Sequence, residues 1–403
     1  MENRLLHTPE GVRDIYGKEF LKKLYIQDSL HSQIKKYGYM DIQTPSFEFF
    51  DVFSKEIGTT PSKELYKFFD KENNTLVLRP DFTPSIARAS AKYFMEEKLP
   101  MRLCYEGNTF TNSSDLRGKL KEVTQIGAEC IGDDSVEVDA EMISIVIESL
   151  LSVGLKDFQV SIGQVEFFKG ICEAAGIDET VELELREQIS NKNYFGTEEI
   201  LTGLHVSEEI KERITKVADL FGTVEILDEA KKMSLNDRSK DAIKRLEDLY
   251  AVLKLYGIEQ YVTFDLGMLN KYHYYTGIVF RAYTFGVGEA IVKGGRYDGL
   301  LSRFGKNCAA IGFGIVVDQL MSAIVRQKIE LPIDHKNTLI VYAEDSLAHA
   351  IAFAKKLREE GRNVELLKQQ GNDKKSTYIS MSKSDLIDNV YLAEKDDIKE
   401  MSE

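Results

Sequence analysis

Cysteine is scarce in this 403-residue chain, and its few cysteines stand far apart. There are four, Cys104, Cys130, Cys172 and Cys308, and no two of them have the spacing of a CxxC motif or of a metal-ligand pair. A secreted disulfide framework would be denser than this. We therefore predict reduced cysteines in the interior of a cytoplasmic protein, with no metal site.

Long apolar runs and a surplus of positive charge are also lacking. No stretch approaches the ~20 apolar residues that a membrane span needs, and the N-terminal segment has no apolar run typical of a signal peptide. The formal net charge is −14. Nucleic-acid binding depends largely on neutralising phosphates, so this charge argues against a large RNA partner such as tRNA. We expect no membrane partner either.

Two common nucleotide-binding motifs are missing as well. The glycine-rich segments, such as GKNCAAIGFG at 305–314, do not form a GxGxxG that follows a first strand. The sequence has no GxxxxGK[ST] segment. Both a dinucleotide-binding fold and a P-loop are therefore disfavoured, and we predict no cofactor.

The first 150 residues alternate helix and strand patterns. Lys18–Tyr37 has apolar residues at helical spacing and is followed by Gly38, which predicts a helix that ends there. Residues 39–45, 65–70 and 74–81 read as strands. Residues 139–153 are largely apolar and predict a helix that Asp139 caps.

The middle of the chain differs from the two ends. From about 170 to 257 the periodicity is helical and strong strand patterns are missing, which indicates a helical insertion. Strand patterns return between about 260 and 316, and a small α/β unit follows a linker near 332–335. We predict an α+β fold with two domains: a core over 1–330 that contains the insertion, and a C-terminal unit over 336–403.

Five segments, taken in order, resemble histidyl-tRNA synthetase. They are KYGYMDIQTPSFE (36–48), LVLRPDFTPSIAR (76–88), RLCYEGNTF to TQIGAECIG (102–132), YHYYTGIVF with VKGGRYDGL (272–300) and AAIGFGIVVDQL (309–320). The resemblance covers about residues 5–325. It implies the antiparallel sheet flanked by helices of class II aminoacyl-tRNA synthetases. The C-terminal unit resembles, more weakly, a shortened anticodon-binding domain.

The resemblance also implies a pocket for free histidine. Its expected members are Asp81 at the α-ammonium group, Thr83 and Gln125 as further oriented hydrogen-bonding groups, Glu129 at an imidazole N–H, and Tyr274 and Tyr275 as stacking and hydrogen-bonding rings. A pocket that reads both ring nitrogens rejects analogues, because unpaired buried polar groups are costly. Any one of these residues could instead be structural, as a buried carboxylate or an Asx turn, but six in family order favour the pocket.

The groups that activate an amino acid are missing from the same frame. Activation develops negative charge on the α-phosphate of ATP, and the family stabilises it with arginines. Here those positions hold Thr111, Asn270 and Gln319, and Ser113 replaces a glutamate. Removal of one such donor typically slows a reaction by roughly 100- to 1000-fold. We therefore predict that adenylation is lost and that the chain has no catalytic residues.

A chain with the pocket but without the chemistry most closely resembles the family of regulatory subunits of ATP phosphoribosyltransferase. This implies a non-catalytic partner that the short catalytic subunit needs for the first step of histidine biosynthesis. It also implies self-association through the class II core, a hetero-octamer, and feedback inhibition by histidine. Two alternatives stay open: a divergent histidyl-tRNA synthetase, and a synthetase paralogue that binds another amino acid.

Overall fold

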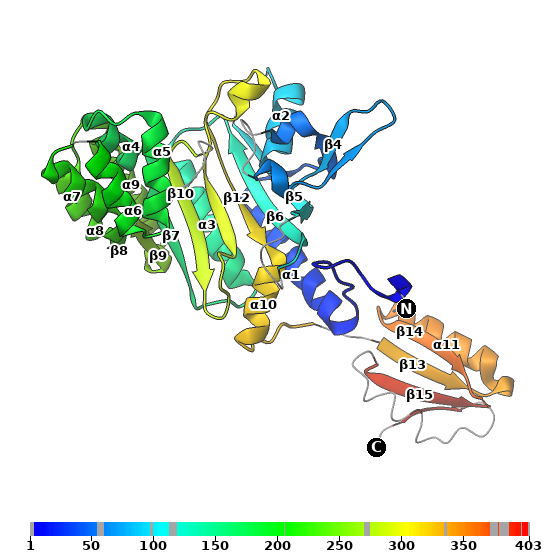
Figure 1. Cartoon of the computed structure of the whole chain (residues 1–403). Coiled ribbons are helices and arrows are strands. Elements are labelled where there is room, and N and C mark those ends of the chain that lie inside the picture. Colours follow the sequence, from blue (N-terminus) through cyan, green and yellow to red (C-terminus); the bar gives the residue numbers. More distant parts are fainter. Residues whose placement is uncertain are drawn as a thin grey trace. The chain divides into compact units, whose positions relative to one another are not determined.

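The computed structural model describes most of the chain. The described residues are 4–54, 60–96, 100–112, 119–204, 206–269, 275–333, 337–370, 378, 387–395 and 397–401. The chain divides into two compact units (Figure 1): one contains residues 1–13 and 26–330, and the other contains residues 14–25 and 331–403. No helix among the described residues is long and apolar enough to cross a membrane.

A nine-stranded sheet is the centre of the larger unit (Figure 1). Most neighbouring strands are antiparallel, whereas β1 with β5 and β7 with β9 are parallel. The predicted α+β class with a large antiparallel sheet is therefore confirmed. In spatial order the strands are β1 (Met40–Asp41), β5 (Met101–Phe110), β6 (Glu122–Ile131), β12 (Ala310–Val316), β11 (Val292–Arg296), β10 (Ile278–Thr284), β7 (Phe158–Gln164), β9 (Val262–Asp265) and β8 (Phe221–Gly222).

Helices cover the central strands. The helix α3 (Val136–Ser152) packs against β12, and α10 (Val317–Arg326) packs against β6 and β12. Both helices are rich in fully buried aliphatic side chains, which explains why β6 and β12 are buried along most of their length. The helix α1 (Gly17–Lys35) ends two residues before the predicted bound. A short helix, α2 (Thr83–Tyr93), begins directly after the LRPDF segment.

The predicted insertion is helical. It contains α4 (Val165–Ala174), α5 (Glu179–Ser190), α6 (Tyr194–Gly203), α7 (Glu208–Lys216), α8 (Ile226–Met233) and α9 (Asp237–Tyr256). The helix α9 packs against α3 and α4, so the insertion is joined to the sheet (Figure 1). It begins with a capping box between Asn236 and Ser239 and ends at Gly257, whose φ of 69° is left-handed.

Two smaller sheets complete the described chain. In the larger unit, β2 (Phe47–Phe49), β4 (Thr75–Leu78) and β3 (Lys67–Phe69) form an antiparallel sheet, as the sequence predicts for the last two. In the smaller unit, the sheet order is β14 (Asn363–Lys368), β13 (Asn337–Tyr342), β15 (Asn389–Glu394) and β16 (Asp397–Glu400). The helix α11 (Leu347–Glu359) packs on this sheet. All four cysteines are free thiols.

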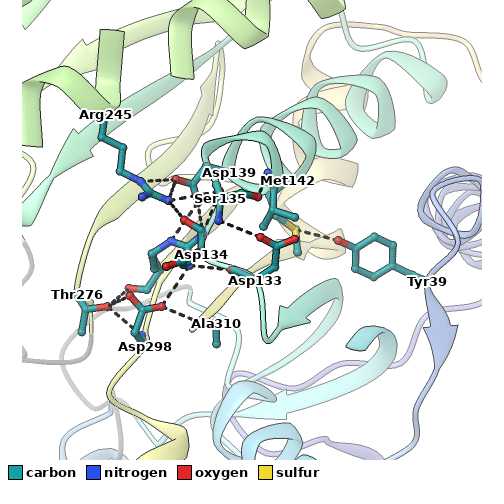
Figure 2. A network of polar contacts seen from close by, with 12 residues as sticks. Tyr39, Asp133, Asp134, Ser135, Asp139, Met142, Arg245, Thr276, Asp298 and Ala310 are labelled. Atoms are coloured by element: carbon teal, nitrogen blue, oxygen red, sulfur yellow. Dashed lines mark hydrogen bonds and ion pairs between the residues drawn. The ribbon is translucent and has the colours of Figure 1, made fainter. Parts of the chain in front are cut away.

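A buried ion-pair network joins β11 to the helices α3 and α9 (Figure 2). Arg296 is the last residue of β11, and its Nη2 donates to Oδ1 of Asp139 at 2.5 Å. Arg245 of α9 donates from Nε to the other oxygen of the same carboxylate at 2.8 Å. Asp139 is fully buried and Arg296 is 3% exposed. The network therefore fixes β11 against both helices.

The predicted role of Asp139 as a helix cap is wrong. Helix α3 begins three residues earlier, and Ser135 is its N-cap, accepting a hydrogen bond from the amide of Val138. Cap preference alone does not separate the two positions, since aspartate and serine both favour N-caps. Asp139 instead lies in the first turn of α3 and forms an ion pair with the buried Arg296.

Asp139→Ala should destabilise the larger unit strongly, because the buried Arg296 then keeps only its longer ion-pair contact with the partly exposed Asp298. Breaking a buried pair on one side costs about 3–5 kcal/mol. We expect this loss in urea unfolding followed by circular dichroism. The matched control is Asp248→Ala, which breaks an exposed pair with Lys244 and should cost less than about 1 kcal/mol. Equal losses in the two variants would contradict a special role for Asp139.

Candidate functional site

A cavity of about 690 Å³ lies on the sheet face opposite to Asp139. Successive residues of a strand point to opposite faces of the sheet. Lys293 and Gly295 of β11 line the cavity, whereas Arg296 points to α3 on the other face. The volume is within the range of small-molecule sites. Its walls come from the LRPD segment, from β5 and β6, and from β10, β11 and β12.

One end of the cavity is a closed polar cluster around Glu129. Glu129 is 1% exposed, and its two carboxylate oxygens accept hydrogen bonds from Thr83 and Tyr297, both of which line the cavity. Burial raises the pKa of Glu129 to about 8; these two hydrogen bonds lower it, and the charge of Asp81 raises it further. A buried carboxyl with a raised pKa beside a cavity marks this end as a candidate functional site.

Glycines form the floor of the cavity. A methyl group on Gly312 would lie 1.5 Å from Glu129 Oε2, and one on Gly314 would lie 1.9 Å from Gln125 Nε2. A methyl group on Gly295 would lie 2.7 Å from a ring carbon of Tyr275. The side chains of Glu129, Gln125 and Tyr275 therefore lie flat across strands that carry no side chains of their own there.

The structure brings five of the six predicted pocket residues together. Asp81, Thr83, Gln125 and Tyr275 line the cavity, and Glu129 lies directly behind its wall. Asp81 accepts the amide of Phe82 at 2.7 Å, which orients its carboxylate at the start of α2. Burial raises the pKa of Tyr275 above its ordinary value, so its phenol stays neutral. The sixth, Tyr274, lies outside the described residues.

Sequence reasoning missed two further tyrosines of this site. Tyr105 is 2% exposed; its hydroxyl accepts from Gln125 Nε2 at 3.1 Å and donates to the carbonyl of Phe313 at 3.2 Å. Tyr297 donates to Glu129. Tyr297 stands within the GGRYDGL segment, so that motif could have indicated it. Tyr105 is two residues from Leu103 on β5, and Leu103 is paired with Glu129 on β6. This pairing register of β5 and β6 cannot be inferred from one sequence.

The opposite end of the cavity carries charged and amide groups. Lys119 forms an ion pair with Glu289, and Gln319 donates to the same carboxylate at 3.1 Å. Thr111 also lines this end. Thr111 and Gln319 thus stand where arginines were expected in an active synthetase. Asn270 and Ser113 lie outside the described residues.

Away from the cavity, three potential metal ligands lie close together. The donor atoms of His31, Asp41 and Cys104 are within 4.8 Å of one another. Asp41 already binds His31 Nε2 at 2.5 Å and Lys35 Nζ at 2.8 Å. Burial raises the pKa of the Cys104 thiol to about 12, and its Sγ donates to Asp41 at 3.3 Å. These contacts describe a hydrogen-bonded ion pair with a neutral thiol, which is a poor metal ligand.

The chain is similar in sequence and in structure to known proteins. The sequence profile of the histidyl-tRNA synthetase family matches residues 11–320. An ATP phosphoribosyltransferase regulatory subunit of Ruminiclostridium cellulolyticum is 40% identical over 98% of this chain and 94% of its own length. The chain belongs to the family of ATP phosphoribosyltransferase regulatory subunits. A relative of the same name from Thermoanaerobacter pseudethanolicus is also 40% identical, over 90% of this chain and 94% of its own.

Solved structures place this regulatory-subunit family on the synthetase fold. A Bacillus halodurans structure described as an ATP phosphoribosyltransferase regulatory subunit/histidyl-tRNA synthetase aligns with a TM-score of 0.86 and 32% identity, over 96% of this chain and 98% of its own. Histidyl-tRNA synthetase from Nostoc aligns with a TM-score of 0.80 over 98% and 97% of the two chains, at 20% identity. The second likeness establishes the fold alone.

Glu129 should make the stability of the chain depend on pH. Because its pKa is raised by folding, the folded chain binds the proton more tightly, and stability falls as pH rises from about 4.5 to about 8. At roughly 1.4 kcal/mol per pKa unit, the full loss is up to about 5 kcal/mol. Glu129→Gln stays neutral, so its stability relative to wild type should increase over this range.

Urea unfolding at pH 5.5 and pH 8.5 measures this difference. Glu137→Gln, at an exposed position of α3, is the control and should follow the wild-type profile. An identical pH profile in Glu129→Gln and wild type would show that this carboxyl does not hold its proton in the folded chain.

Proposed function

We propose that this chain is the histidine-sensing regulatory subunit of an ATP phosphoribosyltransferase complex and has no adenylation activity of its own. One observation carries the proposal. Groups that suit a free histidine line one cavity, with Glu129 directly behind its wall, while Thr111 and Gln319 stand where phosphate-binding arginines were expected. The names of the relatives support the regulatory role.

Histidine would lie with its ring at the closed end of the cavity. A ring N–H would meet the cluster of Glu129, Thr83 and Tyr297, and Tyr275 would stack beside the ring over Gly295. The α-ammonium group would donate to the Asp81 carboxylate and to the amide oxygen of Gln125. The Nε2 of the same amide already donates to the Tyr105 hydroxyl. An amide held this way presents its oxygen in one orientation, which favours an ammonium ligand.

The other end of the cavity supports the loss of adenylation. Activation needs fixed positive charge where the α-phosphate becomes more negative. Here Lys119 is engaged by Glu289, and Gln319 donates to that same carboxylate. A carboxylate at this position would repel a triphosphate and would compete for the nearest cation.

The partner in this proposal is the short ATP phosphoribosyltransferase catalytic subunit, which would need this chain for activity. The chain would pair with itself through its 1–330 core and assemble with the catalytic subunit as a hetero-octamer in the cytoplasm. The 336–403 unit would be a shortened anticodon-binding domain that no longer serves tRNA. Histidine would inhibit because it binds two states of the complex with different affinity.

Mixing the two purified subunits tests the regulatory role. We expect the short subunit to copurify with this chain, to gain activity from it and to be inhibited by histidine. Asp81→Asn should keep the gain in activity but raise the inhibitory histidine concentration by roughly 10- to 100-fold, because a charged hydrogen bond is lost. Asp237→Asn, exposed at the start of α9, is the control and should behave as wild type. Catalytic activity that is indifferent to this chain would refute the proposal.

Histidine-dependent pyrophosphate exchange tests for residual activation. We expect none above background at saturating histidine and ATP, because each lost donor slows the step by roughly 100- to 1000-fold. A histidyl-tRNA synthetase assayed in parallel shows that the conditions support exchange. Readily detected exchange would favour a divergent histidyl-tRNA synthetase instead. Calorimetry with a panel of free amino acids tests the other alternative, a paralogue, which would bind another amino acid more tightly than histidine.

A further inference from the structure

Two cations of the cavity wall form no ion pair or hydrogen bond within the part of the chain that the structure describes. Arg281 of β10 and Lys293 of β11 both line the cavity, and neither forms an ion pair or a hydrogen bond with the described residues. Lys119, the third cation of the wall, differs because Glu289 is bound to it. A cation that remains exposed inside a cavity and is not paired by the protein is available to an anionic ligand.

The sheet register places these two side chains next to each other. Arg281 and Lys293 are directly opposite on β10 and β11, so their side chains leave the same face of the sheet. Lys293 is in turn opposite Gly314, the glycine that the Gln125 side chain covers. Arg281 and Lys293 therefore lie beside the Gln125 amide, which is predicted to bind the ammonium group.

The same register measures how far the cations are from the Glu129 end. Glu129, Gly312 and Gly295 are paired across neighbouring strands, and so are Gly314, Lys293 and Arg281. On each strand that carries both sets, the two sets are two residues apart. Two residues of a strand span about 7 Å. A histidine with its imidazole at Glu129 reaches this far with its carboxylate.

Charges around the two cations leave room for one more anion. Burial, the guanidinium of Arg281 and the ammonium of Lys119 lower the pKa of Lys293, whereas Glu289 and Asp81 raise it. Asp81 and Glu289 lie on other elements, one in the LRPD segment and one before β11, and Glu289 is already shared by Lys119 and Gln319. Arg281 and Lys293 are adjacent like charges, and neither forms an ion pair with a described carboxylate, so a bound carboxylate would relieve their repulsion.

We propose that Arg281 and Lys293 bind the carboxylate of the amino acid, and so make the site selective for a zwitterion. This inference rests on the proposed histidine site. The guanidinium of Arg281 can donate two hydrogen bonds to a carboxylate, and the Lys293 ammonium adds a third donor. The cavity then offers acceptors to the ammonium group at Asp81 and Gln125, and donors to the carboxylate on the neighbouring strands.

Calorimetry with histidine and with histidinol tests this assignment, because histidinol keeps the ring and the ammonium group but has an alcohol in place of the carboxylate. Wild type should bind histidine at least roughly 10-fold more tightly than histidinol. Arg281→Gln and Lys293→Met should each weaken histidine binding by roughly 10- to 100-fold and change histidinol binding by less than about 3-fold. Retained histidinol binding shows that the variant pocket is folded.

The control is Arg213→Gln, which removes a cation paired with Glu209 on the insertion and should leave both ligands unaffected. Equal weakening of histidine and histidinol in the cavity variants would mean a structural role and overturn the inference. An unchanged preference for histidine would overturn it as well, while the proposed histidine site would stand. If wild type binds neither ligand, the proposed site fails and the carboxylate assignment fails with it.

Discussion

The cavity depends on the buried pair between Asp139 and Arg296. This pair fixes the end of β11 against α3, and Arg245 of α9 holds the same carboxylate from the insertion. Because strand residues alternate between faces, the contact that holds Arg296 on one face also sets Gly295 on the other. Tyr297 follows directly and reaches Glu129. One ion pair on the covered face of the sheet therefore positions the residues that form the closed end of the site.

Glycines turn this fixed sheet into a binding surface. Two adjacent strands, β11 and β12, present backbone where Glu129, Gln125 and Tyr275 lie across them, so that polar groups from different segments meet in one layer. Such close approach is available only where no Cβ intervenes. The arrangement explains why the GGRY segment is part of the site although only its tyrosine donates a hydrogen bond there.

The sequence predicted the fold class, and four of the pocket residues that the family resemblance implied, Asp81, Thr83, Gln125 and Tyr275, line the cavity. Glu129 and Asp81 could be placed through motifs that a family resemblance supports. Arg281 and Lys293 could not, since an isolated cation on a strand reads as a solvated residue until the pairing of β10 and β11 is known. Asp139 was taken for a helix cap for a similar reason. Its partner Arg296 is 157 residues away, and nothing near Asp139 in the chain indicates it.

The position of charge also separates binding from catalysis in this fold. A catalyst must hold positive charge where the transition state becomes more negative than the substrate, whereas a sensor needs only the charges that complement the free ligand. The end of the cavity beyond the pocket holds the Lys119–Glu289 pair. Arg281 and Lys293, which no described residue pairs, lie two residues along their strands from the row of Glu129. That distribution complements the ground state of a zwitterion. In the proposed function, binding energy used there gives affinity and selectivity for the free amino acid.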